Sequence, residues 1–76
     1  MDYKIKTHSW CAPHREPYFE SLSVAKSQCN DDPSCAMIYE DGALFDDNRF
    51  FLCSVGATVL SSGLGSVVHI KIGKCL

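Results

Sequence analysis

The first residues of the chain alternate between apolar and polar side chains, with lysines separating Tyr3, Ile5 and Thr7. A period of two is typical of a β-strand with one exposed face. We therefore expect a half-exposed strand that runs from Tyr3 into Cys11. The next segment, 12–17, contains two prolines, which lack a backbone N–H and fix φ. We expect it to be a loop.

A helical period follows this loop. Leu22, Ala25 and Cys29 recur at spacings that place them on one face of a helix. Ser21 is a suitable N-cap, because its hydroxyl can accept a hydrogen bond from a free N–H of the first turn. The pattern predicts a short helix from Ser21 to Asn30. A helix of about ten residues is unstable alone, so tertiary contacts or a crosslink must hold it.

Strand patterns separated by turn residues make up the rest of the chain. We expect strands over 36–40, 49–55 and 67–72, turns at 41–42 and 46–48, and a loop over 61–66. In the last strand, apolar side chains alternate with His69 and Lys71, which are expected on the opposite face. These elements predict an α+β fold in which one short helix packs on a small antiparallel sheet, as a single domain over 1–76.

The cysteine content indicates how so small a domain is stabilised. The chain has 76 residues and five cysteines, and a core of this size usually needs covalent support. A cysteine-rich short chain favours disulfides and an oxidising compartment, so we expect a secreted protein or the extracellular part of a cell-surface protein. Two bridges can be drawn among five cysteines in fifteen ways, and spacing alone does not choose between them.

Charge and hydropathy exclude several classes of partner. The formal net charge is −2 and there is no basic stripe, which argues against nucleic-acid binding. The apolar runs are of strand length, which argues against membrane insertion. The first six residues contain no apolar run, so we expect neither a signal peptide nor an anchor here, and we expect Met1 to be non-native.

The order of the cysteines, together with two sequence motifs, resembles the PAN/apple family. Cys11 precedes the expected helix, Cys29 ends it, and Cys35 follows after a short turn; Cys53 falls in a strand and Cys75 near the end. The helix with its acidic turn and "DPSC" corner, residues 21–35, and the closing strand, residues 67–71, also resemble this family. The resemblance extends over 11–75.

The resemblance implies a pairing of the cysteines. The family joins its first cysteine to its last, its second to its fifth and its third to its fourth. Carried onto this chain, the pattern implies the bridges Cys11–Cys75 and Cys29–Cys35. Ala25 stands where the second cysteine would be, so Cys53 is implied to be a free, buried thiol that faces Ala25.

The resemblance also implies a function, which is non-catalytic recognition or adhesion outside the cell, with a protein or carbohydrate ligand. The charge distribution adds a candidate surface. Eight of the nine acidic residues lie between Glu16 and Asp47, whereas most basic residues lie near the termini. If the first and last strands pair, an exposed basic face forms that would attract an anionic glycan or an acidic protein; an ordinary solvated strand face is the alternative. Its expected residues are Lys4, Lys6, His69 and Lys71.

Two other classes of function remain open at this stage. A small secreted toxin or protease inhibitor would need a rigid exposed loop, for which the segment 12–18 is the candidate. A zinc-stapled interaction module would use Cys11, His14, Cys29 and Cys35, although paired C-x-x-C units are absent. We expect no catalytic residues, because no nucleophile stands in a pattern that supplies it with a base, and we expect no cofactor and no metal.

Overall fold

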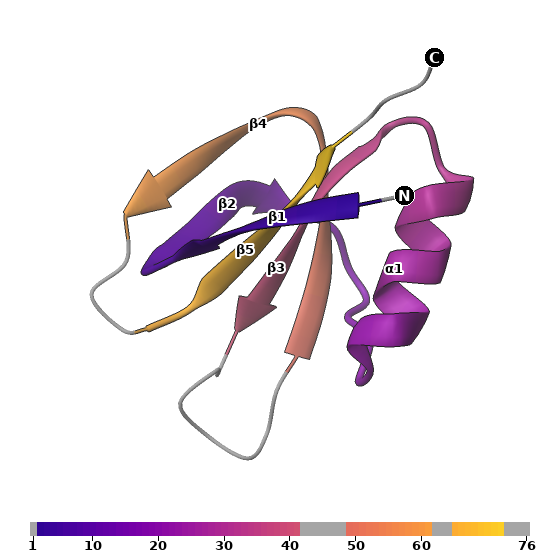
Figure 1. Cartoon of the computed structure of the whole chain (residues 1–76), viewed down its shortest axis with the longest axis horizontal. Coiled ribbons are helices and arrows are strands. Elements are labelled where there is room, and N and C mark those ends of the chain that lie inside the picture. Colours follow the sequence, from indigo (N-terminus) through magenta and orange to yellow (C-terminus); the bar gives the residue numbers. More distant parts are fainter. Residues whose placement is uncertain (1, 42–48, 62–64, 73–76) are drawn as a thin grey trace.

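The computed structural model describes residues 2–41, 49–61 and 65–72. These residues form one helix and a five-stranded antiparallel sheet with the strand order β1-β5-β3-β4-β2 (Figure 1). The expectation of an α+β fold with one short helix on an antiparallel sheet is confirmed, and strands predominate. The elements are β1 (Asp2–Thr7), β2 (Ser9–His14), α1 (Leu22–Asp31), β3 (Cys35–Asp41), β4 (Arg49–Ser61) and β5 (Val67–Ile72).

The helix α1 forms where the sequence predicts it. Ser21 is its N-cap, and the hydroxyl oxygen of this serine accepts a hydrogen bond from the N–H of Val24 at 3.5 Å. Ala25 and Cys29 are fully buried on the face that packs against β3 and β4. The expected apolar face is therefore the one that holds the helix on the sheet.

The strand expected from Tyr3 to Cys11 is divided into two strands. His8 has φ of 53° and separates β1 from β2. This left-handed backbone conformation is uncommon for residues other than glycine, and it turns the chain away from a straight extension. As a result β1 pairs with β5 and β2 pairs with β4, at opposite edges of the sheet.

Two other boundaries differ from the sequence expectations. β2 continues to His14, with a register shift between Ala12 and His14. Pro13 lies at this irregularity, where its lack of a backbone N–H does not remove a hydrogen bond between the strands. β4 continues to Ser61 and changes partner along its length, from β3 to β2. Gly56, with φ of 96°, lies in this long strand, in a conformation that glycine adopts without strain.

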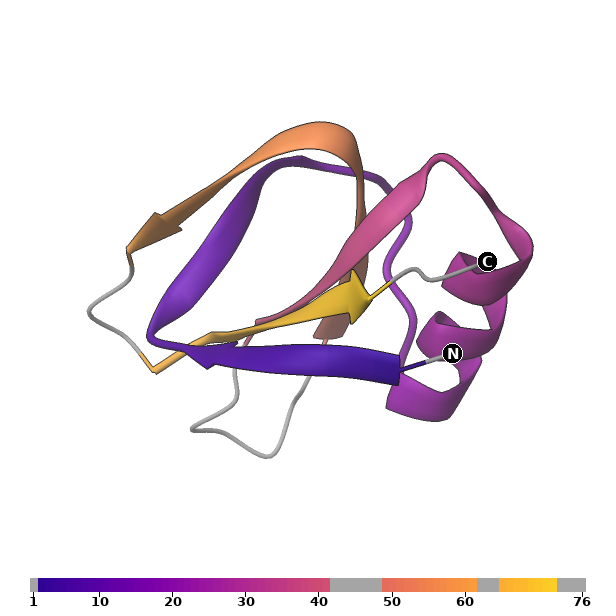
Figure 2. The same cartoon turned by 45° about the horizontal axis from the view of Figure 1, so that its top comes forward.

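The sheet is rolled, and its two edges meet at one corner. Figure 2 shows β1 and β2 leaving this corner in different directions, with α1 at the other end of the molecule. Ser9 and Ser66 close the corner, because the Ser9 N–H donates to the Ser66 carbonyl at 3.1 Å and the Ser66 hydroxyl donates to the Ser9 carbonyl at 2.9 Å. Both serines are buried, so these hydrogen bonds satisfy groups that are removed from water.

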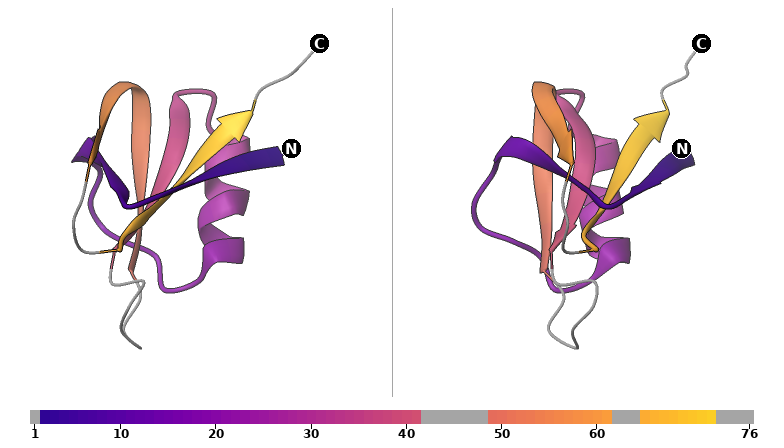
Figure 3. Two further views of the ribbon diagram at one scale, coloured as in Figure 1. Left: turned by 60° about the vertical axis from the view of Figure 1, so that its left-hand side comes forward. Right: turned by 90° about the vertical axis from the view of Figure 1, so that its left-hand side faces the viewer.

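The two faces of the sheet contribute to separate apolar clusters. Figure 3 shows α1 on one side of the sheet, and the cluster under it consists of Ala25, Cys29, Cys35, Ile38, Phe50 and Leu52. The cluster on the opposite face consists of Cys11, Met37, Cys53 and Val68. The division follows from the alternation of side chains along β3 and β4.

The disulfide pairing differs in part from the one that the resemblance implied. Cys29–Cys35 is present as expected. Cys11, however, is bonded to Cys53, with a Cα–Cα distance of 6.4 Å, so the implied bridge from Cys11 to Cys75 is wrong and Cys53 is not a free thiol. One physical reason is the bend at His8, after which β2 pairs with β4. A second is the irregular register that follows, in which Ala12 lies opposite Thr58 and His14 opposite Cys53, so that Cys53 lies near the β2 residues next to Cys11.

The expected contact between Ala25 and Cys53 is also wrong. Ala25 lies in the cluster under α1, whereas Cys53 lies in the cluster on the opposite face of the sheet. Both residues are fully buried. A cysteine at position 25 would therefore meet the side chains around Cys29 and Ile38 rather than Cys53.

Some expectations fall outside the described residues. They are the glycine of the turn at 41–42, the turn at 46–48, the middle of the loop at 61–66, and Cys75.

The two bridges should contribute unequally to stability. In the chain-entropy model the Cys11–Cys53 bridge, with a sequence separation of 42, is worth up to about 4 kcal/mol, and the Cys29–Cys35 bridge, with a separation of 6, about 2 kcal/mol. We expect the Cys11→Ala/Cys53→Ala variant to lose more free energy of unfolding in urea than Cys29→Ala/Cys35→Ala. Peptide mapping without reduction should link Cys11 to Cys53, and a Cys11–Cys75 peptide would contradict the structure.

Candidate functional site

The four residues of the expected basic face are divided between the two faces of the sheet. β1 does pair with β5, as expected for the first and last strands. In the observed register Lys4 lies opposite Ile70 and Lys6 opposite Val68, whereas His69 lies opposite Ile5. Partners in an antiparallel ladder point to the same side. Lys4 and Lys6 are therefore exposed on one face, and His69 and Lys71 lie on the other, so the expected continuous basic face is wrong.

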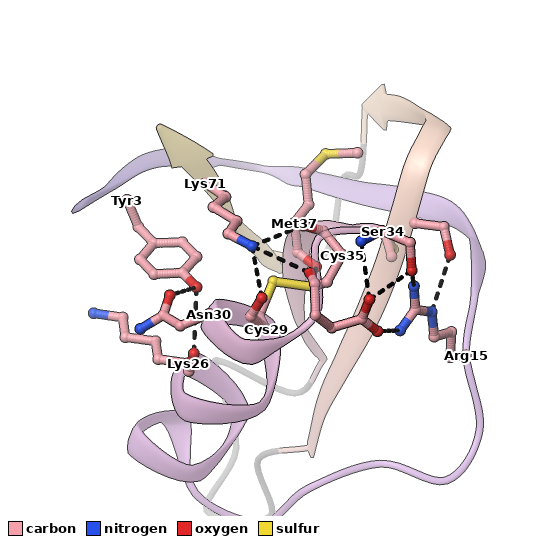
Figure 4. Close-up of a disulfide and its surroundings, with 12 residues drawn as sticks. Tyr3, Arg15, Lys26, Cys29, Asn30, Ser34, Cys35, Met37 and Lys71 are labelled. Carbon is pink, nitrogen blue, oxygen red and sulfur yellow. Dashed lines mark hydrogen bonds and ion pairs between the residues drawn. A yellow bond between two sulfur atoms is a disulfide. The ribbon is translucent and has the colours of Figure 1, made fainter. Parts of the chain in front are cut away.

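Lys71 is bound to the end of the helix instead of being presented to solvent. Its ammonium group donates to the carbonyl oxygens of Cys29 at 2.6 Å, Asp32 at 3.2 Å and Cys35 at 3.3 Å (Figure 4). A cation is favourable here, because the carbonyls at a helix C-terminus lack intrahelical partners and carry partial negative charge. Lys71 is a structural cap.

His69 is also unavailable to a ligand, because only 5 % of its side chain is exposed. Its Nε2 lies 3.0 Å from Oε1 of Glu40, and its Nδ1 has no hydrogen-bond partner among the residues that the structure describes. His69 belongs to β5, which lies between β1 and β3, and its Cα is paired with those of Ile5 and Ile38. Its place is thus structural.

A second polar network fixes the segment between β2 and α1. The guanidinium of Arg15 donates from Nε to Ser54 at 2.9 Å, from Nη1 to Asp32 at 2.6 Å and from Nη2 to Ser34 at 2.8 Å (Figure 4). The backbone N–H of Arg15 also donates to the carbonyl of Leu52 at 2.8 Å. Arg15 therefore connects three segments: its own loop, the turn that follows α1, and β4. Its planar guanidinium can donate in several fixed directions at once, which an ammonium group does less well.

The carboxylate of Asp32 is the acceptor at the centre of this network. It accepts from the hydroxyl and the backbone N–H of Ser34 at 2.7 and 2.9 Å, besides Arg15. The hydrogen bond from the Ser34 hydroxyl, followed by that from Arg15, lowers the pKa of Asp32 to about 2. These donors favour the charged form, and the carboxylate is ionised throughout the physiological range.

On the face that α1 leaves uncovered, five aromatic rings lie in contact and form what we call the aromatic strip: Trp10, His14, Tyr18, Tyr39 and Phe51. The ring centroids of His14 and Phe51 are 4.3 Å apart, and those of Tyr39 and Phe51 are 5.8 Å apart. Trp10 extends the strip beyond Tyr39 at 6.3 Å, and Tyr18 extends it beyond Phe51 at 5.7 Å. The separations of Tyr39 from Phe51, Trp10 from Tyr39 and Tyr18 from Phe51 are those of favourable aromatic pairs, and His14 lies closer to Phe51 than any of these.

The strip combines a buried base with accessible rings. Phe51 is 6 % exposed and Tyr18 is 42 % exposed, and the other rings are half-buried. Polar groups border it, because Arg49 lies over the Tyr18 ring at 5.7 Å and the Tyr39 hydroxyl donates to Asp41 at 3.3 Å. Burial and the Asp41 carboxylate raise the pKa of Tyr39, so its hydroxyl remains a donor.

Lys6 lies in the same row of side chains as the strip. The register pairs Lys6 with Val68, Val68 with Tyr39 and Tyr39 with Phe51, so one row runs across four strands on one face. The sequence reasoning missed this site. The tyrosine and the phenylalanine are visible in the sequence, but their alignment depends on the register of β3 with β4, which the sequence alone does not give.

The expected absence of a metal site bears on the zinc alternative. No three histidine, cysteine or acidic side chains among them gather as metal ligands. The three sulfurs that a zinc site would use, those of Cys11, Cys29 and Cys35, are all bonded in disulfides. Over the same part of the chain, no helix is both long and apolar enough to cross a membrane.

Comparison with known proteins finds no family model, no curated protein and no solved structure that matches the chain.

The acceptor role of Asp32 predicts a pH dependence of stability. The ordinary pKa of 3.8 is lowered to about 2 in the folded protein, so the stabilisation is complete above the ordinary value and is lost as pH falls through about 2. We expect Asp32→Asn to be less stable than the wild type at pH 7, and the difference to shrink between pH 4 and pH 2. Chemical denaturation across this range measures it. Asp31→Asn is the matched control, because Asp31 takes no part in this network, and it should not reproduce the loss seen for Asp32→Asn at pH 7.

Because Lys71 caps the end of α1, replacing it should lower the stability of the domain while the fold is kept. Lys71→Met keeps the apolar stem and removes the charged donor from three carbonyl groups. We expect it to reduce the free energy of unfolding by about 1–3 kcal/mol, as measured in urea. Lys4→Met, at an exposed position of β1, should change stability by less than about 0.5 kcal/mol. Equal effects of the two substitutions would contradict the capping role.

Proposed function

We propose that this chain is a non-catalytic recognition or adhesion module that acts outside the cell and binds a protein or a carbohydrate through the aromatic strip. The observation that carries the proposal is the strip itself, a set of contacting rings on the face that α1 leaves uncovered. Partly exposed aromatic side chains on a rigid base are favoured at binding surfaces, because they bury much area and lose little conformational entropy.

The two disulfides support an extracellular location. Bridges of this kind persist in oxidising compartments and are rare in the cytosol, and both Cys11–Cys53 and Cys29–Cys35 are buried. We infer a secreted protein or the extracellular part of a cell-surface protein.

The resemblance to PAN/apple modules supports the same function in part. The Cys29–Cys35 bridge at the end of α1 and the packing of α1 on an antiparallel sheet agree with the pattern of that family. The Cys11–Cys53 bridge departs from it. The proposal of a PAN/apple-like module therefore rests on the helix and its bridge.

Lys6 favours a ligand with an anionic group. Its ammonium group is exposed at one end of the row that contains Tyr39 and Phe51. A cation at this place would add a long-range attraction to the short-range contacts of the rings. We propose that an acidic group of the ligand, on a glycan or on a protein, lies at this end.

The rival function of a toxin or protease inhibitor receives less support. The segment 12–18, its candidate loop, is fixed to β4 through the backbone and side chain of Arg15 and through the ring of His14. A reactive loop that enters another protein's cleft would need to protrude from its scaffold.

Screening the protein on a glycan array and against purified extracellular proteins should identify a ligand whose affinity depends on the strip. We expect Tyr18→Ala to weaken binding at least about tenfold, because truncation of an exposed interface aromatic commonly costs this much. Lys6→Gln should reduce the salt dependence of binding. Both effects are measurable by calorimetry at several salt concentrations.

The matched control is Val55→Ala, which truncates an exposed apolar side chain, 69 % exposed, outside the strip. Unchanged affinity in Tyr18→Ala and in a folded Trp10→Ala variant would place binding on another surface and refute the proposal.

A further inference from the structure

A cleft lies between α1 and the segment that connects β2 to α1, apart from the rings of the aromatic strip. Its volume is about 330 Å³, and its lining includes Phe19 and Leu52 as well as Glu16, Gln28 and Asp31. This volume is at the lower end of the range for ligand pockets. It suits one long side chain or a small molecule of similar size.

The base of the cleft is apolar and its rim is acidic. Leu52 is buried and Phe19 half-buried, and Pro17 adds apolar surface at the edge. Glu16 and Asp31 are exposed carboxylates at the rim. An apolar base below negative charge is the environment in which a lysine or arginine can bury its stem and pair its head group.

The charges of the lining do not cancel. Arg15 is the cation in the lining, and its guanidinium is already bonded to Asp32, Ser34 and Ser54. Asp31 has no hydrogen-bond or ion-pair partner among the described residues. Oε2 of Glu16 lies 3.6 Å from Nδ1 of His14, and this contact is an ion pair only when the histidine is protonated. With Arg15 and Asp32 neutralising each other, two negative charges remain.

The walls of the cleft are held in place before any ligand binds. Phe19 and Phe50 exchange two backbone hydrogen bonds of 2.8 and 2.9 Å, and the backbone N–H of Arg15 donates to Leu52. The opposite wall is the last turn of α1, which the Cys29–Cys35 bridge secures. A cleft that is fixed in advance loses little entropy when it is filled.

We propose that this cleft binds the side chain of an arginine or lysine presented by a protein partner. The charge complementarity and the apolar base select this occupant, because a free metal ion would not use Phe19 and Leu52, and an anion would be repelled by Glu16 and Asp31. The inference builds on the proposed recognition function and adds a second contact, with a protein as the partner class.

The test uses N-acetyl-arginine methylamide as the probe and N-acetyl-citrulline methylamide as its neutral counterpart of nearly the same shape. Titration into the ¹⁵N-labelled protein, followed by amide chemical shifts, should show saturable shifts for the arginine probe at residues 15–19 and 28–32. The citrulline probe should give no saturable shifts. The shifts should weaken as salt is added.

Variants locate the site of binding. Glu16→Gln/Asp31→Asn removes the free charge of the rim and should weaken binding of the arginine probe at least about tenfold. Glu20→Gln, an exposed acid of the same segment that does not line the cleft, is the matched control and should leave binding unchanged. Both variants change exposed carboxylates to amides of the same shape, and their amide spectra report that the fold is intact.

The outcomes separate this inference from the proposed function. Absence of saturable shifts, equal binding of the citrulline probe, or loss of binding in Glu20→Gln alone would overturn the cleft proposal, whatever ligand the strip binds. Probe binding that persists in Trp10→Ala supports a cleft independent of the strip. If the probe binds and no ligand depends on Tyr18, the strip proposal fails and the cleft proposal stands.

Discussion

The attachment of residues 9–19 to β4 is the constraint on which the rest of the structure depends. The Cys11–Cys53 bridge holds its first part, the Arg15 N–H to Leu52 hydrogen bond holds its middle, and the exchange of hydrogen bonds between Phe19 and Phe50 holds its end. This attachment rolls the sheet, since it places β2 against the far half of β4. It also positions both candidate binding surfaces, because His14 and Tyr18 belong to the aromatic strip whereas Glu16 and Phe19 line the cleft.

The end of α1 is the second place where several interactions converge. The Cys29–Cys35 bridge, the Lys71 ammonium group and the Arg15–Asp32 pair all act within the same short stretch of chain (Figure 4). The last turn of this ten-residue helix contains no basic residue, and the local contact to its carbonyls is the N–H of Asp32, which donates to Cys29 at 3.2 Å. The compensating charge comes from β5 instead. For this reason Lys71, which the sequence pattern places on an exposed strand face, stabilises the end of α1 instead.

Periodicity in the sequence was sufficient to predict α1 with its Ser21 cap and the strands β3 and β5, because local side-chain patterns determine these elements. It was insufficient for the N-terminal segment, because nothing in the alternation of Tyr3 to Cys11 reveals the positive φ of His8. The wrong partner for Cys11 follows from this bend, because β2 pairs with β4 while β1 pairs with β5. The wrong environment for Cys53 follows from the alternation of side chains along β4, which places Cys53 on the face opposite α1. The strip depends on strand register, and the cleft depends on contacts between segments that are distant in the sequence. Neither register nor such contacts can be read from the periodicity of the sequence.

The aromatic strip and the cleft both include residues of the segment that connects β2 to α1. His14 belongs to the strip and Glu16 to the rim of the cleft, and their side chains are 3.6 Å apart. If both proposed surfaces bind, one partner would meet them in a fixed arrangement, because the segment between them is held to β4 at Arg15 and Phe19. Once one contact has formed, the second becomes intramolecular and gains from a high effective concentration. On this proposal, two contacts in a domain of 76 residues would together give more affinity and specificity than either gives alone.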